Sequence, residues 1–360
     1  MTEPFSKRRR VLNEALVRQK LGALVVTHPP DWYYLTGFTG EAGALVLGQN
    51  WATLITDGRF IMQGREETRS VEIVQYKAGL FQAVGELLKG LKMQRAGFDP
   101  SQLNVAQHQE LRKVTGPRCK LKPVSGLVLA LRTRKEPQEL AQMHQAAILA
   151  SEVVQHAIGL LKPGVRELEI AAEIEYQMRK RGASGPAFES IVAFGERTAL
   201  PHARPTSKQL RKNEFVVLDL GAILGHYCSD ITRTVFVGRA SARIRRWHRA
   251  VQEARSAAVA AVRAGVSCGE VDATARRVLA GHRLERYFVH STGHGLGLEV
   301  HEEPRVARGQ KQQLVPGNVI TIEPGVYIPD IGGIRIEDDV AVLAGGAQIL
   351  TSAPRELIEI

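Results

Sequence analysis

Three short glycine-rich blocks in the second half of this 360-residue chain place acidic residues and a histidine inside strand-like sequence. Carboxylates that approach one another in a sheet repel unless a cation joins them. The blocks therefore predict strands that close around cations, most simply a pair of divalent metal ions. The blocks are VVLDLGAILGHYCSDITRT (216–234), HSTGHGLGLEVHEEP (290–304) and ITIEPGVYIPDIGGIRIEDD (320–339), and their candidate ligands are Asp219, Asp230, His294, Glu323 and Glu337.

The first block predicts a β-hairpin that brings two acids together. If Leu224 and Gly225 form its turn, Asp219 and Asp230 lie directly opposite each other, about 4.5–5.5 Å apart at Cβ. Two carboxylates at that distance would destabilise the sheet, and a metal ion reverses the sign of the interaction. The alternative is a shifted turn that leaves one aspartate facing solvent.

The third block repeats this arrangement, because Glu323 and Glu337 are placed symmetrically about residue 330. Glycines on either side of His294 allow the backbone to approach an ion or a substrate closely. Four carboxylates are neutralised by two divalent cations, and paired metals typically lie about 3.5–4 Å apart. A set of mostly oxygen ligands with one imidazole and no thiolate favours Mn²⁺ or Co²⁺, with Zn²⁺ or Fe²⁺ as alternatives, over a closed structural zinc site.

The overall composition indicates a globular protein, with 44% hydrophobic and 24% charged residues. The net charge of +11 is dispersed, and we interpret its densest clusters, KRRR (7–10) and RIRRWHR (243–249), as solvated helix faces rather than a nucleic-acid site. No apolar run approaches the roughly 20 residues that span a bilayer, and no secretory signal is recognisable, so no membrane partner is expected. Three scattered cysteines fit reduced thiols in the cytoplasm.

The pattern of apolar residues predicts two domains, 1–130 and 131–360. The first alternates short buried strands (23–27, 44–48, 52–56, 71–76 and 96–100) with helices near 7–20 and 81–91, which is typical of an α/β layer. A polar joint then leads into a long helix from 136 to 161, which Lys-Pro-Gly ends. Two further helices are expected at 165–181 and 241–264, on either side of the hairpin-rich region.

The three blocks resemble those of the pita-bread metallopeptidases, a family that includes methionine aminopeptidase, aminopeptidase P and prolidase. Family members carry Asp, Asp, His, Glu and Glu ligands in the order seen here. The resemblance implies an α+β protein with a C-terminal pita-bread catalytic domain. The segments DWYYLTGFTGE (31–41) and LITDGRF (54–60) resemble the smaller creatinase-like N-terminal domain of the proline-specific branch. In this branch we expect that domain to restrict the substrate and support oligomerisation.

Further residues match the family's active site one at a time. His202 in ALPHARP corresponds to a histidine that contacts the scissile amide, and His301 in EVHEEP to one that stabilises the tetrahedral intermediate. His290 matches an additional active-site histidine of the proline-specific branch. Arg335 in GIRIED matches an arginine that supports the last ligand. Arg305 in HEEPR resembles an arginine that meets the carboxylate of a dipeptide.

The resemblance thus implies metal-dependent hydrolysis of the bond between an N-terminal residue and proline. In this reaction a metal-bridging hydroxide attacks the carbonyl, and Glu323 moves the proton while also binding metal. The expected partners are proline-containing peptides and a second copy of the chain, as a homodimer, without nucleic acid. The length of the substrate, a dipeptide or a longer peptide, stays open. The alternatives are an enzyme like methionine aminopeptidase, or a binding scaffold of the same fold without peptidase activity.

Overall fold

The computed structural model describes residues 4–360, and these form two compact units that divide between Arg132 and Thr133. Each unit has its own core. Across residues 4–360 we find no helix with the length and apolar character that a bilayer crossing demands. The two units are described separately.

The first unit is built on a mixed sheet, in the order β4-β3-β2-β1-β5-β6 within residues 4–132. The central strands β1 and β2 are buried and antiparallel, and the parallel pairs β1–β5, β5–β6 and β3–β4 extend the sheet on both sides. All five strands expected from the sequence are present. The strands are β1 (Ala23–Val26), β2 (Ala44–Gly48), β3 (Trp51–Thr56), β4 (Glu72–Gln75), β5 (Arg95–Phe98) and β6 (Lys120–Pro123).

Helices join and cover these strands. The helices expected near residues 7–20 and 81–91 are observed as α1 and α4, whereas α2, α3, α5 and α6 were not assigned from the sequence. The helices are α1 (Pro4–Arg18), α2 (Pro29–Thr36), α3 (Ile61–Glu67), α4 (Leu80–Gly90), α5 (Val105–Thr115) and α6 (Leu127–Arg132).

The basic cluster at the start of α1 is only half the solvated face that we expected, because Lys7 and Arg10 are exposed but the two arginines between them are not. Arg8 and Arg9 are both buried. Arg8 donates to the carbonyl of Tyr34 and Arg9 to that of Leu35, at 3.1 and 2.8 Å. They thus satisfy carbonyls at the end of α2 that have no partner within that helix. The prediction is correct for the cluster at 243–249, whose arginines are exposed.

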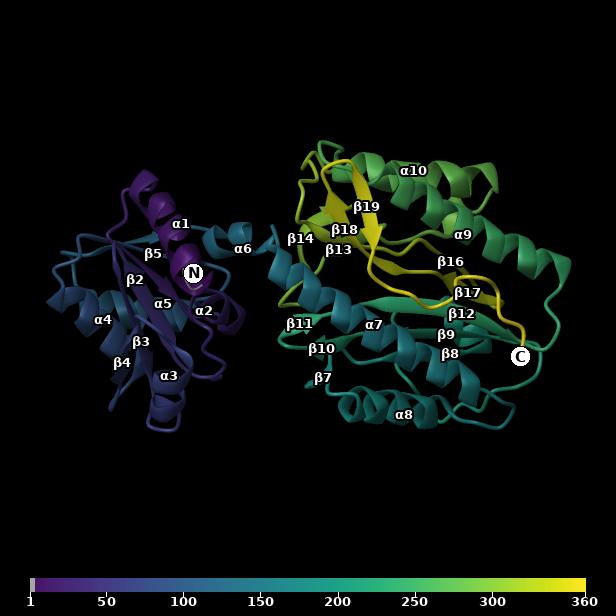
Figure 1. Ribbon diagram of the computed structural model, residues 1–360, viewed down its shortest axis with the longest axis horizontal. Coiled ribbons are helices and arrows are strands. Elements are labelled where there is room, and N and C mark those ends of the chain that lie inside the picture. The colour runs from purple at the N-terminus through teal and green to yellow at the C-terminus, as the bar shows by residue number, and fades with distance from the viewer. Residues whose placement is uncertain (1–3) are drawn as a thin grey trace. The chain divides into compact units, whose positions relative to one another are not determined.

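The second unit places helices on both outer sides of its strands (Figure 1). α7 and α8 pack on one side and α9 and α10 on the other, with contacts between the members of each pair. The expected helices at 136–161, 165–181 and 241–264 are confirmed as α7, α8 and α9, whereas α10 was missed because its sequence is rich in small and charged residues. The helices are α7 (Pro137–Leu160), α8 (Glu167–Lys180), α9 (Ala242–Ala261) and α10 (Cys268–Gly281).

The strands between these helices form two main sheets, three-stranded β12-β9-β8 and five-stranded β14-β13-β15-β18-β19, among residues 133–360. Two smaller sheets, β11-β10-β7 and β16-β17, contain the ends of hairpins, because β10 and β11 lie between β9 and β12 in the chain and β16 and β17 lie between β15 and β18. The strands are β7 (Gly185–Pro186), β8 (Ile191–Phe194), β9 (Glu214–Leu220), β10 (Ala222–Leu224), β11 (Tyr227–Cys228), β12 (Ile231–Val237), β13 (Gly293–Gly295), β14 (Glu302–Val306), β15 (Val319–Ile322), β16 (Gly325–Ile328), β17 (Gly332–Arg335), β18 (Asp338–Leu343) and β19 (Gly346–Ile349).

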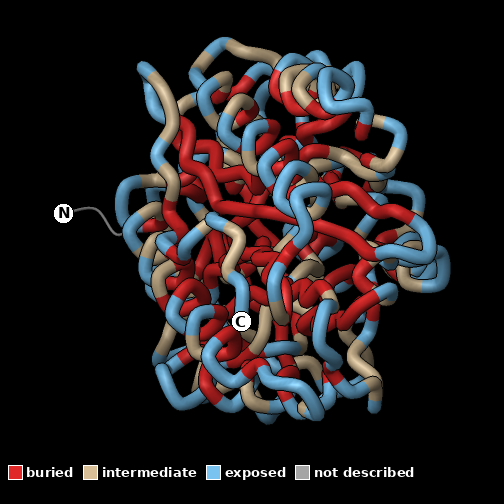
Figure 2. Tube along the Cα trace, turned by 90° about the vertical axis from the view of Figure 1, so that its right-hand side faces the viewer, coloured by how far each residue is buried: buried red, intermediate tan, exposed pale blue. Residues whose placement is uncertain are grey.

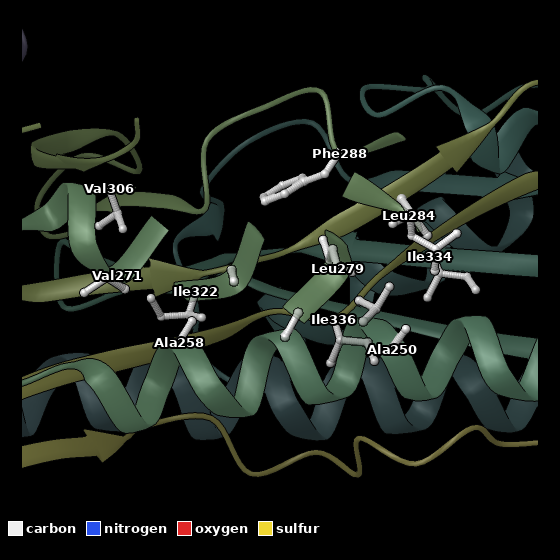
Figure 3. Close-up of a cluster of buried hydrophobic side chains, with 14 of the residues drawn as sticks. Ala250, Ala258, Val271, Leu279, Leu284, Phe288, Val306, Ile322, Ile334 and Ile336 are labelled. Atoms are coloured by element: carbon white, nitrogen blue, oxygen red, sulfur yellow. The ribbon is translucent and has the colours of Figure 1, made fainter. Parts of the chain in front are cut away.

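Two apolar clusters hold the helices against these sheets. In one, Ala250 and Ala258 of α9 and Leu279 of α10 face Ile322 of β15 and Ile336, which lies between β17 and β18 (Figure 3). The other joins α7 and α8 to β8, β9 and β12. The buried stretches of the trace lie inside and the exposed ones outside (Figure 2). Burial of this apolar surface, at roughly 25 cal/mol per Å², fixes the strands that carry the polar residues described next.

The first hairpin turns one residue later than predicted. Its two central residues are Gly225 and His226, with φ of 55° and 72°. A two-residue type I′ turn needs positive φ at both positions, which Leu224 would adopt only with strain. Asp219 therefore pairs with Thr232, and Asp230 becomes its diagonal neighbour rather than its direct partner.

Both aspartates remain on one buried face, so the alternative in which one faces solvent is also wrong. The second predicted pairing agrees with the observed register. The ladder that pairs Ile322 with Asp338 and Gly325 with Arg335 places Glu323 opposite Glu337.

Candidate metal centre

The five candidate ligands come from strands of both main sheets and from the ends of the hairpin strands. Asp219 lies in β9 and His294 in β13, and Asp230 immediately precedes β12. Glu323 follows β15, and Glu337 lies between β17 and β18. Ligand atoms of Asp230, His294 and Glu337 lie within 4.8 Å of one another. Neighbouring strands thus converge their polar side chains on one point.

His294 is oriented as a neutral ligand. Its Nδ1–H donates to the carbonyl of Gly295 at 2.9 Å, which leaves Nε2 as the lone-pair nitrogen. Nε2 lies 3.7 Å from Asp230 Oδ2 and 3.6 Å from Glu323 Oε1. Burial lowers the pKa of His294 to about 4, so the imidazole is neutral at pH 7. A backbone hydrogen bond of this kind commonly holds histidines that bind metals.

The negative charge of these carboxylates is not balanced by the cationic side chains of the protein around them. Burial, reinforced by repulsion from Glu337 and Asp219, raises the pKa of Asp230 well above its usual value. Burial also raises the pKa of Glu337 well above its usual value, and that of Glu323 to about 7. Among residues 4–360, Oδ1 of Asp219 and Oδ1 of Asp230 are buried without a hydrogen-bond partner. Such oxygens are normally satisfied, and divalent cations would satisfy both them and the excess negative charge.

Arg335 holds one side of this cluster. Its guanidinium donates to Asp219, to Thr232 Oγ1 at 3.1 Å and to the hydroxyl of Tyr327 at 2.6 Å. Thr232 in turn donates to Glu337. The arginine thus contacts Asp219 directly and Glu337 through Thr232.

Three supporting residues were missed by the sequence analysis. Thr232 and Tyr327 bond to Arg335 as described, and Asp339 accepts the backbone N–H of Asp230 at 3.0 Å. The strand period of two was an available signal, because Thr232 follows Asp230 by two residues and Asp339 follows Glu337 by two. Nothing in the sequence singled out Tyr327, which pairs with a distant histidine.

The predicted active-site histidines surround the acids unequally. His290 lies closest, with Nδ1 3.9 Å from Glu323 Oε2 and Nε2 2.8 Å from the Tyr327 hydroxyl. The ring of His301 lies 4.3 Å from that of His294, in an edge-on contact, and the residue is exposed. His202 is exposed as well, and Pro201 beside it accepts a hydrogen bond from Arg335.

Arg305 stands apart from the other predicted residues. It lies in β14 with Glu303 on the exposed side of the strand, and its backbone N–H donates to the Glu303 carboxylate at 3.2 Å. Within residues 4–360 its guanidinium forms no ion pair. Within residues 4–360 the structure therefore brings the five candidate ligands, Arg335 and His290 together by direct contacts and His301 by a ring contact, whereas the side chains of His202 and Arg305 make no such contact.

Comparison with known proteins agrees with this arrangement. Residues 141–344 match metallopeptidase family M24, and residues 8–134 match the creatinase/prolidase N-terminal domain. An Xaa-Pro dipeptidase from Pyrococcus horikoshii is 36% identical over 347 residues, covering 96% of this chain and 97% of the relative.

Solved structures show the same likeness. An Xaa-Pro dipeptidase from Bacillus anthracis superposes with a TM-score of 0.95 at 36% identity, over 99% of this chain and 100% of the other. An X-Pro aminopeptidase from Thermotoga maritima gives a TM-score of 0.89 at 32% identity, over 96% and 100%. The predicted α+β fold and the family resemblance are confirmed. The chain belongs to metallopeptidase family M24, with divalent metal ions as its cofactors.

Proposed function

We propose that this protein is an Xaa-Pro dipeptidase, which hydrolyses the bond between an N-terminal residue and a C-terminal proline. The observation that carries the proposal is the group of carboxylates from Asp230, Glu323 and Glu337 around the imidazole of His294. It lies in a chain that matches relatives named Xaa-Pro dipeptidase along almost its whole length. Neither alternative, a methionine aminopeptidase-like enzyme or a binding scaffold, gains support from these relatives.

Asp219, Asp230, His294, Glu323 and Glu337 would hold two metal ions. When bound, the ions lower the pKa of water to supply a nucleophile near neutral pH and polarise the attacked carbonyl. The oxygen-rich set with one imidazole and no thiolate favours Mn²⁺ or Co²⁺. The buried oxygens of Asp219 and Asp230 that have no partner within residues 4–360 support this ligand assignment.

The remaining residues would handle the proton and the substrate. Glu323 Oε2 would accept and return a proton, with His290 Nδ1 3.9 Å away. His301 would donate to the oxyanion of the tetrahedral intermediate, which is a large term in amide hydrolysis. His202, exposed at the edge of the site, would position the amide before proline. Arg335 would keep Asp219 in place.

Arg305 would recognise the free carboxylate of the dipeptide. Arg305 is exposed, and a guanidinium binds a carboxylate through two parallel hydrogen bonds. A second candidate function is an Xaa-Pro aminopeptidase, which the similarity to the Thermotoga maritima enzyme supports. In that case Arg305 would not meet a terminal carboxylate at the proline.

We further propose that the protein is a cytoplasmic homodimer, with residues 1–130 restricting the substrate and contributing to the dimer, and residues 131–360 carrying catalysis. In the described part of the chain, Cys119 and Cys268 are buried free thiols and Cys228 is buried as well, which suits a reducing compartment.

The test is hydrolysis of an Xaa-Pro dipeptide and an Xaa-Pro-Yaa tripeptide by metal-stripped protein, with and without added Mn²⁺ or Co²⁺. We expect metal-dependent cleavage of the dipeptide alone, and a larger rise in KM than fall in kcat for Arg305→Met. Release of only the first residue from the tripeptide would favour the aminopeptidase. No cleavage of either peptide with any metal would contradict both assignments.

A further inference from the structure

The segment 288–292 carries His290 into the site without belonging to any strand or helix. It joins a short 3-10 turn (Glu285–Tyr287) to β13. Its backbone polar groups therefore have no ladder of their own, although buried groups of this kind need partners. Two side chains of α10, Asp272 and Arg276, supply them.

Arg276 reaches this segment in three ways. It donates to the carbonyl of Phe288 at 3.1 Å and to that of His290 at 2.6 Å. Its guanidinium also lies over the ring of Phe288, 4.3 Å from the centroid. That ring meets the imidazole of His290 edge-on, with centroids 5.0 Å apart. Arg276 thus contacts both the backbone of His290 and the aromatic ring that packs on its side chain.

Asp272 completes the arrangement one helical turn earlier. It is fully buried and accepts two hydrogen bonds from Arg276, at 2.7 and 3.2 Å. Its Oδ1 also accepts the hydroxyl and the backbone N–H of Thr292, at 2.8 and 3.2 Å. The carbonyl of Thr292 then accepts the backbone N–H of Glu323 at 2.8 Å. A continuous chain of hydrogen bonds therefore runs from α10 to a candidate metal ligand.

We propose that Asp272 and Arg276 are positioning residues, which hold His290 and Glu323 in their working geometry. A bidentate ion pair with further hydrogen bonds is rigid, and the segment it holds has no regular structure of its own to keep it in place. The inference rests on the proposed function for His290, but its effect on Glu323 concerns metal binding and requires no substrate.

The first test is titration of the metal-stripped protein with Mn²⁺ by calorimetry. Asp272→Asn and Arg276→Met should each weaken Mn²⁺ binding about 10-fold or more, because partners of metal ligands typically contribute 10–100-fold. Arg277→Met is the matched control, since this neighbour on α10 is largely exposed and pairs with Glu270 instead. Unchanged Mn²⁺ affinity in both Asp272→Asn and Arg276→Met, with unaltered thermal unfolding, would overturn the proposal. If either variant fails to fold, Thr292→Val removes a single donor to Asp272 and should weaken binding in the same direction.

The second test is a double-mutant cycle on the dipeptide. The assay is run at Mn²⁺ concentrations that saturate every variant, so that weaker metal binding does not contribute. If Arg276 then acts through His290, Arg276→Met should lower kcat/KM about 10-fold in the native sequence and less than about 2-fold when His290→Ala is already present. Equal losses in both backgrounds would refute the part that concerns His290. If the unmodified protein cleaves no proline peptide, the proposed function fails, and the Mn²⁺ titration alone decides whether the pair positions Glu323.

Discussion

His248 is a buried histidine outside the metal centre, and it should make the catalytic domain sensitive to mild acid. It lies in α9, its Nε2 has no hydrogen-bond partner within residues 4–360, and burial lowers its pKa from 6.5 to about 4 against a smaller opposing effect of Glu356. Between pH 6.5 and pH 4, His248 is therefore protonated in the unfolded chain but mostly neutral in the folded protein. This residue therefore leaves the free energy of unfolding unchanged well above pH 6.5 and lowers it as the pH falls towards 4.

The magnitude follows from these two values. At pH 8 both states are neutral at this site and the contribution is close to zero. At pH 5 the unfolded state is almost fully protonated while the folded state is not, which costs about 2 kcal/mol. Below pH 4 the cost would approach about 3 kcal/mol. In a protein with a total stability of roughly 5–15 kcal/mol this is a large share.

The assay is hydrogen exchange of peptides covering α9, at pH 8 and pH 5, corrected for intrinsic exchange rates. His248→Gln removes the titrating group, so the native sequence should lose about 2 kcal/mol more opening free energy over this range than the variant does. Arg249→Gln, on the exposed side of the same helix, serves as the control and should behave as the native sequence does. Equal losses in the native protein and His248→Gln would refute the reasoning.

Three other predictions follow from the same contacts. Arg335→Met should weaken Mn²⁺ binding or kcat/KM by about 10–100-fold, because Asp219 and Thr232 lose their shared donor; calorimetry and peptide assays measure this, and native values would contradict it. Asp338→Asn should lower the free energy of unfolding by about 3–5 kcal/mol, since Arg233, Arg255 and Arg355 all converge on this buried carboxylate. Urea denaturation measures this, and a free energy of unfolding that falls by less than a fifth of that amount would be inconsistent. The Mn²⁺ affinity of the metal-stripped protein should fall as the pH drops below 7, because burial raises the pKa of Glu323 to about 7 without metal and Mn²⁺ must then displace a proton. The expected fall is about 10-fold per pH unit for each proton displaced. An affinity that stays constant between pH 7.5 and 5.5 would rule this out.

Much of the metal centre was predictable because charged residues inside strands are rare and informative. The register of Glu323 and Glu337 was predictable from symmetry about the turn alone. The predicted turn of the first hairpin was one residue too early. Periodicity does not reveal which residues adopt a positive φ, as His226 does here. The error changed the pairing of Asp219 and Asp230 but not the face on which they lie.

Contacts between side chains and segments distant in the sequence could not be predicted from the sequence. Asp272 and Arg276 look like an ordinary ion pair one helical turn apart on a surface helix, and only the packing of α10 reveals that they hold a distant segment. Arg8 and Arg9 similarly resemble a solvated cluster until α2 is placed against them. The arginines bond to backbone carbonyls and Asp272 to Thr292, and neither kind of partner can be recognised from composition or spacing.

The central claim is that Asp219, Asp230, His294, Glu323 and Glu337 bind two divalent ions on which peptide hydrolysis depends. The most direct test is Mn²⁺ stoichiometry, measured by calorimetry on metal-stripped protein, together with cleavage of an Xaa-Pro dipeptide, for the native sequence and for Asp230→Asn. We predict two ions per chain with metal-dependent cleavage for the native protein, and loss of tight binding and of cleavage for the variant. Native stoichiometry and turnover in Asp230→Asn would contradict the account.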